Sequence, residues 1–507
     1  MTEFLARLGD RINPIVVKET RQAVNSRLVA AFLLIFLGVQ LLVMLLTITG
    51  REVSGSDVDL RAGREMFTIV QGILLGACMV LIPTMTGARL ASERSDVNVD
   101  LLFISSLTPR AVLLGKLIAA AALALLIFSA CAPFMTFAYV MRGLDMPTIL
   151  IVLTGDYLAV LLGTTWALFL ASVPANRGLR ILLGLGGFFF ICYLGGGLLV
   201  ASAAFLRGGS DFDLGTWEFW LACLGVIGLT FGSIGLLFVW SVALISPPAA
   251  NRAFQVRVYT LLLWALGFVG FAIWSLLIGR PEPVGIWGML GCAAFSLQMV
   301  VAVCERDHWG GRVARRIPRN VALRVPAFIF YSGAAGGIAF GVIGAALSAV
   351  GIAFWYLILP STRYSREEEY ALIAVLVAAY TYCYSLTAAV IRRALDGKSA
   401  FRPGYTWVIA LILFGLGCTL PFIFRFAFSD PYSRYGHDEL MPLYVTNPAV
   451  MIPDAVRLSD NHVVFTIIFL MLWGGVITMA NAQWFVKQAM NFRPPDSEPE
   501  FEVVERE

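Results

Sequence analysis

The feature that most constrains this sequence is a series of twelve long apolar runs. A helix needs about 20 predominantly apolar residues to cross a bilayer, and a helix satisfies its own backbone hydrogen-bonding groups within the hydrocarbon. We therefore expect an all-α, polytopic membrane protein with about twelve transmembrane helices. The expected spans are 28–49, 66–87, 112–140, 147–173, 181–206, 219–246, 258–279, 285–304, 328–359, 370–391, 405–427 and 463–486.

The composition supports a lipid environment and excludes most soluble classes. Hydrophobic residues make up 59% of the chain and charged residues only 14%, whereas soluble domains carry about 25% charged residues. A water-facing surface cannot be covered with so few charges, so most soluble enzymes and nucleic-acid binders are excluded. The third and ninth runs are long enough to predict tilted or broken helices, and prolines within spans predict kinks at Pro83, Pro133 and Pro421.

The basic residues predict the orientation of the chain. With the N-terminus placed inside, the inner segments hold 26 Lys and Arg residues and the outer segments hold 11. Positive charge is enriched on the cytoplasmic side of membrane proteins, so we expect both termini to be cytoplasmic. The longest outer segment, 428–462, is expected to fold into a small lid or helix.

These boundaries divide the chain into five parts. We expect an interfacial helix before the first span, a six-span unit with a cytoplasmic loop over 88–111, a connector, a second six-span unit and an acidic, disordered tail. Their ranges are 1–27, 28–246, 247–257, 258–486 and 487–507.

Catalytic and metal-binding motifs are missing from the sequence. Gly397, Lys398 and Ser399 match the end of a phosphate-binding loop, but Arg392 replaces its first glycine and no strand precedes it. No GxSxG or HExxH motif occurs, and the eight cysteines and three histidines form no ligand cluster. We therefore expect no metal site, no cofactor and no enzymatic activity in this chain.

The N-terminal segment 11–27 has the pattern of an amphipathic helix. Asn13 before Pro14 suits an N-cap followed by the first helical residue. At 100° per residue the apolar and polar side chains separate, which favours a helix lying in the membrane interface; an ordinary polar lead-in is the alternative. The apolar side comprises Val16, Val17, Thr20, Ala23 and Val24, and the polar side Lys18, Arg21, Gln22 and Asn25.

The loop between the second and third spans carries a second distinctive pattern. A Leu-rich stretch lies between charged ends and stops at Thr108-Pro109, where Pro109 suits the first turn of a new helix. A short cytoplasmic helix braced by two spans can be pushed by a partner. A solvated inner loop is the plain alternative.

Together these segments resemble the permease subunits of ABC-2 type transporters. That family often has Asn-Pro-x-x-x-Lys-Glu before its interfacial "elbow" helix, and a first cytoplasmic loop with Glu-Arg, Leu-Leu, Thr-Pro, Arg and Leu-Gly-Lys. Val97-Asn98 and Ser106 depart from the family's pattern. The matching positions are Asn13, Pro14, Lys18 and Glu19 in the first segment, and Glu93, Arg94, Asp100, Leu101, Leu102, Leu107, Thr108, Pro109, Arg110, Leu114, Gly115 and Lys116 in the second.

The resemblance implies a division of labour between subunits. A separate cytoplasmic ABC ATPase, with its own ATP and Mg²⁺, would bind the permease at the coupling loop 93–110. ATP-driven closure of that ATPase would rock the spans and export a substrate. The resemblance also implies a multi-pass location in the bacterial inner (cell) membrane, and a pore formed by this chain alone or with a second permease chain.

The second six spans leave two interpretations open. They are either an internal repeat of the permease half or a diverged accessory membrane domain. In the first case the loop 305–327 takes the coupling-loop position and begins with Glu305-Arg306, like Glu93-Arg94, but it lacks the Leu-Leu and Thr-Pro elements. Its many arginines also suit simple anchoring to anionic lipid.

Glycines inside the spans are spaced as in packed helix pairs. Gly333, Gly337 and Gly341 follow GxxxGxxxG, and Gly228 and Gly232 follow GxxxG, a spacing that lets helices approach closely. These glycines are interpreted as packing positions, with a substrate path as the alternative.

Asp156 is the acid that falls well inside a span. It is a candidate for the translocation path or a buried, hydrogen-bonded structural residue. An ion-driven secondary transporter and a non-transporting membrane scaffold therefore stay as alternatives to the ABC permease.

Overall fold

The computed structural model describes a largely helical chain. The described residues are 14–54, 61–93, 108–141, 144–207, 215–247, 250–306, 309–359, 367–395, 403–428, 444–457 and 460–494. Every regular element in these ranges is a helix, and twelve helices are long and apolar enough to span a membrane. The all-α, polytopic class is thereby confirmed. The chain divides into two compact units, Met1–Pro247 (unit 1) and Pro248–Glu507 (unit 2).

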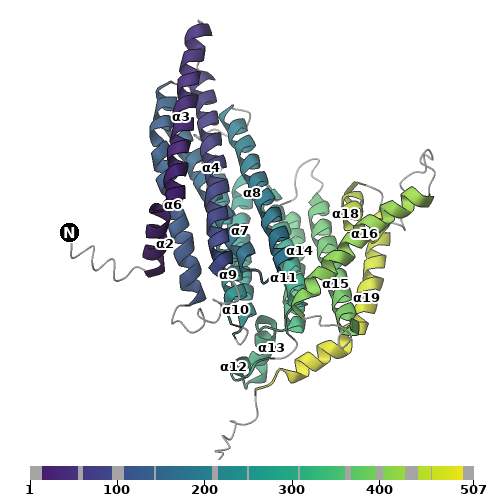
Figure 1. The fold of residues 1–507 in the computed structure, drawn as a ribbon. Coiled ribbons are helices and arrows are strands. Elements are labelled where there is room, and N and C mark those ends of the chain that lie inside the picture. The colour runs from purple at the N-terminus through teal and green to yellow at the C-terminus, as the bar shows by residue number, and fades with distance from the viewer. Residues whose placement is uncertain are drawn as a thin grey trace, which may run out of the picture. The chain divides into compact units, whose positions relative to one another are not determined.

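The described part of unit 1 comprises six spanning helices and one short helix that precedes them (Figure 1). α4 lies at its centre, packed against α6, α7 and α8. More than half of the apolar window of α4 is buried, against 6% for α9, so α9 lies at the periphery. The helices are α2 (Pro14–Val24), α3 (Arg27–Ser54), α4 (Arg61–Glu93), α6 (Pro109–Val140), α7 (Met146–Ser172), α8 (Arg177–Leu206) and α9 (Trp217–Ile245).

Unit 2 is built around α11, α14 and α15, which pack tightly on one another. Its other spanning helices have few fully buried residues in their apolar windows. The elements are α10 (Arg252–Ile278), α11 (Glu282–Ala302), α12 (Gly311–Ala314), α13 (Val321–Phe330), α14 (Ala334–Ile358), α15 (Glu367–Leu395), η1 (Pro403–Tyr405), α16 (Thr406–Phe428), α18 (Pro448–Arg457) and α19 (Asp460–Asn491).

The outward faces of the peripheral helices are apolar. Leu34 of α3, Leu266 of α10 and Met479 of α19 are each more than 70% exposed, and many other large apolar side chains are also exposed. Soluble monomers rarely expose contiguous apolar surface on this scale. These faces are suited to contact with lipid.

Helix boundaries depart from the sequence-based expectation in three places. The ninth run is broken, because α13 ends at Phe330 and α14 begins at Ala334, whereas the long third run forms the continuous helix α6. α10 begins at Arg252, so half of the expected connector 247–257 is helical. α19 continues to Asn491, so the expected tail begins as helix.

The glycine patterns differ in what they contact. A Cβ on Gly341 would lie 2.8 Å from the carbonyl oxygen of Phe295, and one on Gly337 would lie 3.0 Å from Cζ of Arg257, so α14 needs both glycines to approach its neighbours. A Cβ on Gly333 would meet the Trp309 ring at 3.1 Å. Gly228 is different: among the described residues no atom lies within 4 Å of its added Cβ, although Gly232 is buried. The packing role of Gly228, at an interface of two halves, therefore stays a prediction.

The buried segment before α18 supplies hydrogen-bond donors to two carbonyls of α16 near Pro421. Pro421 has no N–H for the carbonyl of Gly417, four residues earlier. The hydroxyl of Thr446 donates to that carbonyl at 3.4 Å, and the side-chain amide of Asn447 donates to the carbonyl of Cys418 at 3.0 Å. Tyr380 of α15 donates in turn to the carbonyl of Val445 at 2.7 Å. The expected small helix in 428–462 is α18, and the segment leading into it is buried in unit 2.

Candidate coupling site

Lys116 of α6 lies at the centre of a cluster of charged side chains, here called the Lys116 cluster. Its Nζ donates to Oε1 of Glu19 at 2.8 Å and to Oε1 of Glu93 at 2.9 Å. Arg89 places Nη1 3.9 Å from Oε2 of Glu19. The side chain of Lys116 is only 2% exposed and that of Glu19 only 7%. The cluster therefore contains two acids and two bases, so its charges balance. Lys116 and Glu19 have little access to water, whereas the side chains of Glu93 and Arg89 are 42% and 31% exposed.

Three separate elements supply these side chains. Glu19 comes from α2, Arg89 and Glu93 from the last turns of α4, and Lys116 from the beginning of α6. Glu93 is the last residue of α4, and α6 begins at Pro109. The cluster thus joins the two ends of the loop that runs from α4 to α6, and fastens α2 to both.

The start of α6 follows from its local sequence. Thr108 is the N-cap residue in an extended conformation, and its side chain accepts from the backbone N–H of Ala111 at 3.3 Å. Pro109 occupies the first helical position, where a missing N–H costs nothing. This confirms the helix start predicted at Thr108-Pro109, and it places Lys116 two turns inside α6.

Gly115 lets α2 lie directly against α6. A Cβ on Gly115 would come within 2.7 Å of Cγ2 of Ile15 and 3.0 Å of its Cβ, closer than side-chain atoms pack. The Gly-Lys pair at 115–116 therefore has two roles: the glycine provides the close approach, and the lysine provides the buried cation that holds Glu19.

α2 buries Glu19, a residue that the sequence-based separation of apolar and polar faces left unassigned. Glu19 and Ala23 are the buried side chains, whereas Val17 and Val24 are 46% and 50% exposed. Buried charge is costly unless it is paired, so Glu19 faces the protein because Lys116 is there to pair with it. The exposed valines leave an apolar edge for lipid, as an interfacial helix requires.

The structure describes part of the predicted coupling set. Pro14 begins α2, and Lys18, Thr108 and Arg110 are exposed. Glu19, Glu93 and Lys116 come together, which the sequence did not reveal. Arg89 was missed, although its position four residues before Glu93 on one helix was a usable signal. The remaining predicted residues, Asn13, Arg94, Asp100, Leu101 and Leu102, lie outside the described residues.

Asp156 is a second buried polar centre of unit 1. It is 1% exposed, and its Oδ2 accepts from Nε2 of Gln71 at 3.0 Å. The same Nε2 lies 3.0 Å from the hydroxyl oxygen of Ser202. Oδ1 of Asp156 finds no hydrogen-bond partner among the described residues. The network links α7, α4 and α8 within unit 1, so Asp156 is buried and hydrogen-bonded. Its place in a translocation path stays a prediction.

Unit 2 has an ion pair at the start of its own basic loop. Nη2 of Arg257 lies 2.6 Å from Oε1 of Glu305, and Nη1 donates to the carbonyl of Ile329 at 2.9 Å. Glu93 thus ends the second span of unit 1, Glu305 follows the second span of unit 2, and each pairs with a buried cation. The cation comes from the third span in unit 1 and from the first span in unit 2, so the two pairings are not equivalent.

No protein-family model, no curated protein and no solved structure matches this chain.

Proposed function

We propose that this protein is the membrane-spanning permease of an ATP-binding-cassette exporter, in which a separate cytoplasmic ATPase supplies the energy. The observation that carries the proposal is the Lys116 cluster. It ties the interfacial helix α2 to both ends of the loop between α4 and α6, the loop that resembles the coupling segment of ABC-2 permeases.

The cluster gives a route for force from that loop into the membrane. Displacement of the loop acts directly on Glu93 at the end of α4 and on Thr108 at the start of α6. Because Lys116 binds both Glu19 and Glu93, α2 moves with these two helix ends. α4 and α6 have about half of their apolar windows buried in unit 1, so their movement repacks the helices around them.

The alternative of an ion-driven carrier rests on Asp156. Oδ2 of its carboxylate accepts from Gln71, whereas Oδ1 has no hydrogen-bond partner among the described residues. Carriers of that class use buried acids or bases to bind the coupling ion. Asp156→Asn keeps the shape and one acceptor oxygen. On the ABC proposal this variant retains ATP-dependent transport, whereas an ion-coupled carrier loses its ion dependence.

Charge reversal at the coupling loop tests the proposal. The chain is purified from native membranes with its bound partners, and the ATPase is identified by mass spectrometry. We expect Glu93→Lys and Asp100→Lys to lose the ATPase, or to retain it with ATP turnover that no longer responds to the permease. Glu218→Lys is the matched control, because Glu218 is exposed in the first turn of α9, at the predicted outer side.

Two results contradict the proposal. One is the recovery of no ABC ATPase with the wild-type chain. The other is normal complex formation and ATP turnover in both loop variants.

A further inference from the structure

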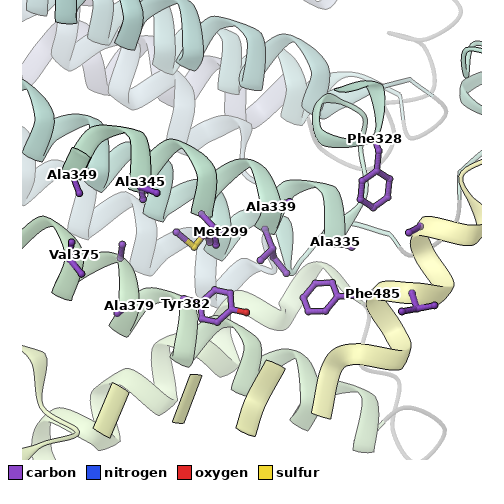
Figure 2. A pocket seen from close by; sticks show the side chains of 16 residues that line it. Met299, Phe328, Ala335, Ala339, Ala345, Ala349, Val375, Ala379, Tyr382 and Phe485 are labelled. Carbon is purple, nitrogen blue, oxygen red and sulfur yellow. The ribbon is translucent and has the colours of Figure 1, made fainter. Parts of the chain in front are cut away.

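A long apolar groove runs along unit 2 between α14, α15 and α19. It has a volume of about 710 Å³, and Met299 of α11 lies in its floor. Figure 2 shows Ala335, Ala339, Ala345 and Ala349 following one another along one wall. We call this cavity the α14–α19 groove. Eight of its sixteen lining residues are alanines, whose short side chains leave the space between the helices unfilled.

The shape and chemistry of the groove suit a hydrocarbon chain. From Ala335 to Ala349 the groove follows fourteen helical steps, a length of roughly 21 Å at 1.5 Å per residue. Among its lining side chains, Tyr382 carries the one polar group, and its hydroxyl is bonded to the Thr478 hydroxyl at 2.8 Å. The groove therefore offers no free polar group along its length.

Basic residues lie close in sequence to the side chains at one end of the groove. Phe328 of α13 and Phe485 of α19 line this end. Arg324 lies one turn before Phe328 on the same helix, and its guanidinium donates to the carbonyls of Pro318 and Arg319 at 3.3 and 3.0 Å. Lys487 follows the lining residue Val486 and is exposed. Arg493 is also exposed, directly after Phe492, whose ring lies 5.4 Å from that of Phe328.

The sequence around α13 strengthens this charge. Residues 309–330 contain five arginines and no acidic residue. The arginines preceding α13, at 312, 315, 316 and 319, are exposed. α13 itself exposes Val321, Leu323 and Val325 by 60% or more. Apolar side chains beside arginines are the pattern of a helix in the membrane interface, so the charged end of the groove lies at headgroup level.

We propose that the α14–α19 groove binds an anionic glycerophospholipid. An acyl chain lies along the alanine wall, and the phosphate lies at the Phe328–Phe485 end, where Arg324, Lys487 and Arg493 attract it. Charge complementarity selects the anionic headgroup, since each basic side chain near a membrane surface favours an anionic lipid by a similar increment. The site is independent of the coupling loop and of the proposed export function.

Photocrosslinking in reconstituted membranes tests the site. The full chain is placed in nanodiscs with phosphatidylglycerol or phosphatidylcholine probes that carry the same photoreactive acyl chain, and crosslinked peptides are mapped. We expect the phosphatidylglycerol probe to label residues 335–349 and 485–489 more strongly than the phosphatidylcholine probe.

Two test substitutions, Ala346→Trp and Lys487→Gln, and one control distinguish binding in the groove from general lipid contact. Ala346→Trp fills the groove from an exposed lining position and should abolish labelling there. Ala353→Trp is the matched control, because Ala353 is exposed on the same helix but does not line the groove. Lys487→Gln should reduce the preference for phosphatidylglycerol about fivefold, the factor expected for one basic residue near an anionic surface. Labelling of α3 in unit 1 reports correct membrane insertion in every variant.

Three results overturn the proposal. The first is equal labelling of the groove by the two probes. The second is groove labelling that survives Ala346→Trp. The third is labelling spread evenly over the exposed helices, which is contact with bulk lipid only.

Discussion

Lys116 illustrates how much depends on one buried side chain in this protein. A lysine at 2% exposure is tolerable only because two carboxylates accept hydrogen bonds from its ammonium group. A cavity of about 20 Å³ beside Glu19, Arg89 and Lys116 has room for about one water molecule, which suits the third N–H of the ammonium group. The contacts of Lys116 reach α2 and the end of α4, so the residue serves as a joint between elements.

A double-mutant cycle tests this joint. Lys116→Met leaves the buried Glu19 without its partner, and we expect it to destabilise unit 1 by about 3 kcal/mol, the usual cost of breaking a buried pair. Glu19→Gln combined with Lys116→Met should recover a large part of that loss, because the charges that remain, on Arg89 and Glu93, have access to water. The measurement is the midpoint of thermal unfolding in detergent; additive effects of the two substitutions would show that the residues do not interact.

At the scale of elements, two helical runs of unit 2 are interrupted, and other segments of the unit hydrogen-bond to the backbone groups left free there. α16 contains Pro421, which leaves the carbonyl of Gly417 without its helical donor, and Thr446 supplies a hydroxyl instead. The ninth run breaks before Gly333, and Glu305 accepts from the Gly333 N–H. Irregular backbone at membrane depth requires such partners within the protein. These two interruptions therefore determine where the buried segment 444–447 and the loop containing Glu305 are held.

Restoring the missing N–H at position 421 tests whether the Thr446 hydroxyl replaces it as the donor to Gly417. Thr446→Val removes the donor to Gly417, and we expect a loss of about 1–3 kcal/mol from the unsatisfied carbonyl. Adding Pro421→Ala to this variant supplies a backbone N–H in the right place, so the combined variant should be more stable than Thr446→Val alone. The resistance of the purified chain to heat in detergent is compared for the three proteins. If the proline replacement gives no recovery, the hydroxyl of Thr446 does not stand in for the absent N–H.

At the scale of the whole molecule, the sequence predicted the spans well and the contacts poorly. All twelve runs correspond to spanning helices; the ninth is shortened to α14 by the break before Gly333. A run of apolar residues is a local property, and its required length is set by the bilayer. The pairing of Arg257 with Glu305 was missed, because Arg257 was assigned to a connector outside the membrane. The groove along α14 was also missed, because small residues indicate close approach without showing which neighbour approaches.

Thiol labelling tests the predicted orientation of the whole chain. In a background without the native cysteines, single cysteines are introduced by Gly310→Cys and Leu440→Cys. A membrane-impermeant maleimide added to intact cells should label position 440 and not position 310, because basic residues are concentrated in the segments predicted to be inside. Labelling of position 310 from outside, without position 440, would reverse the assignment of the two faces.

Run length, hydropathy and charge placement were sufficient to predict a membrane protein with twelve spanning helices. Each of these properties is local along the chain, and each is matched to the bilayer without reference to the other helices. Tertiary structure alone brought Lys116 to Glu19, 97 residues away, and to Glu93, 23 residues away. It also opened the groove beside α14. The physical reason is that a buried charge or an unfilled space depends on which helices pack together, and that choice belongs to the fold as a whole.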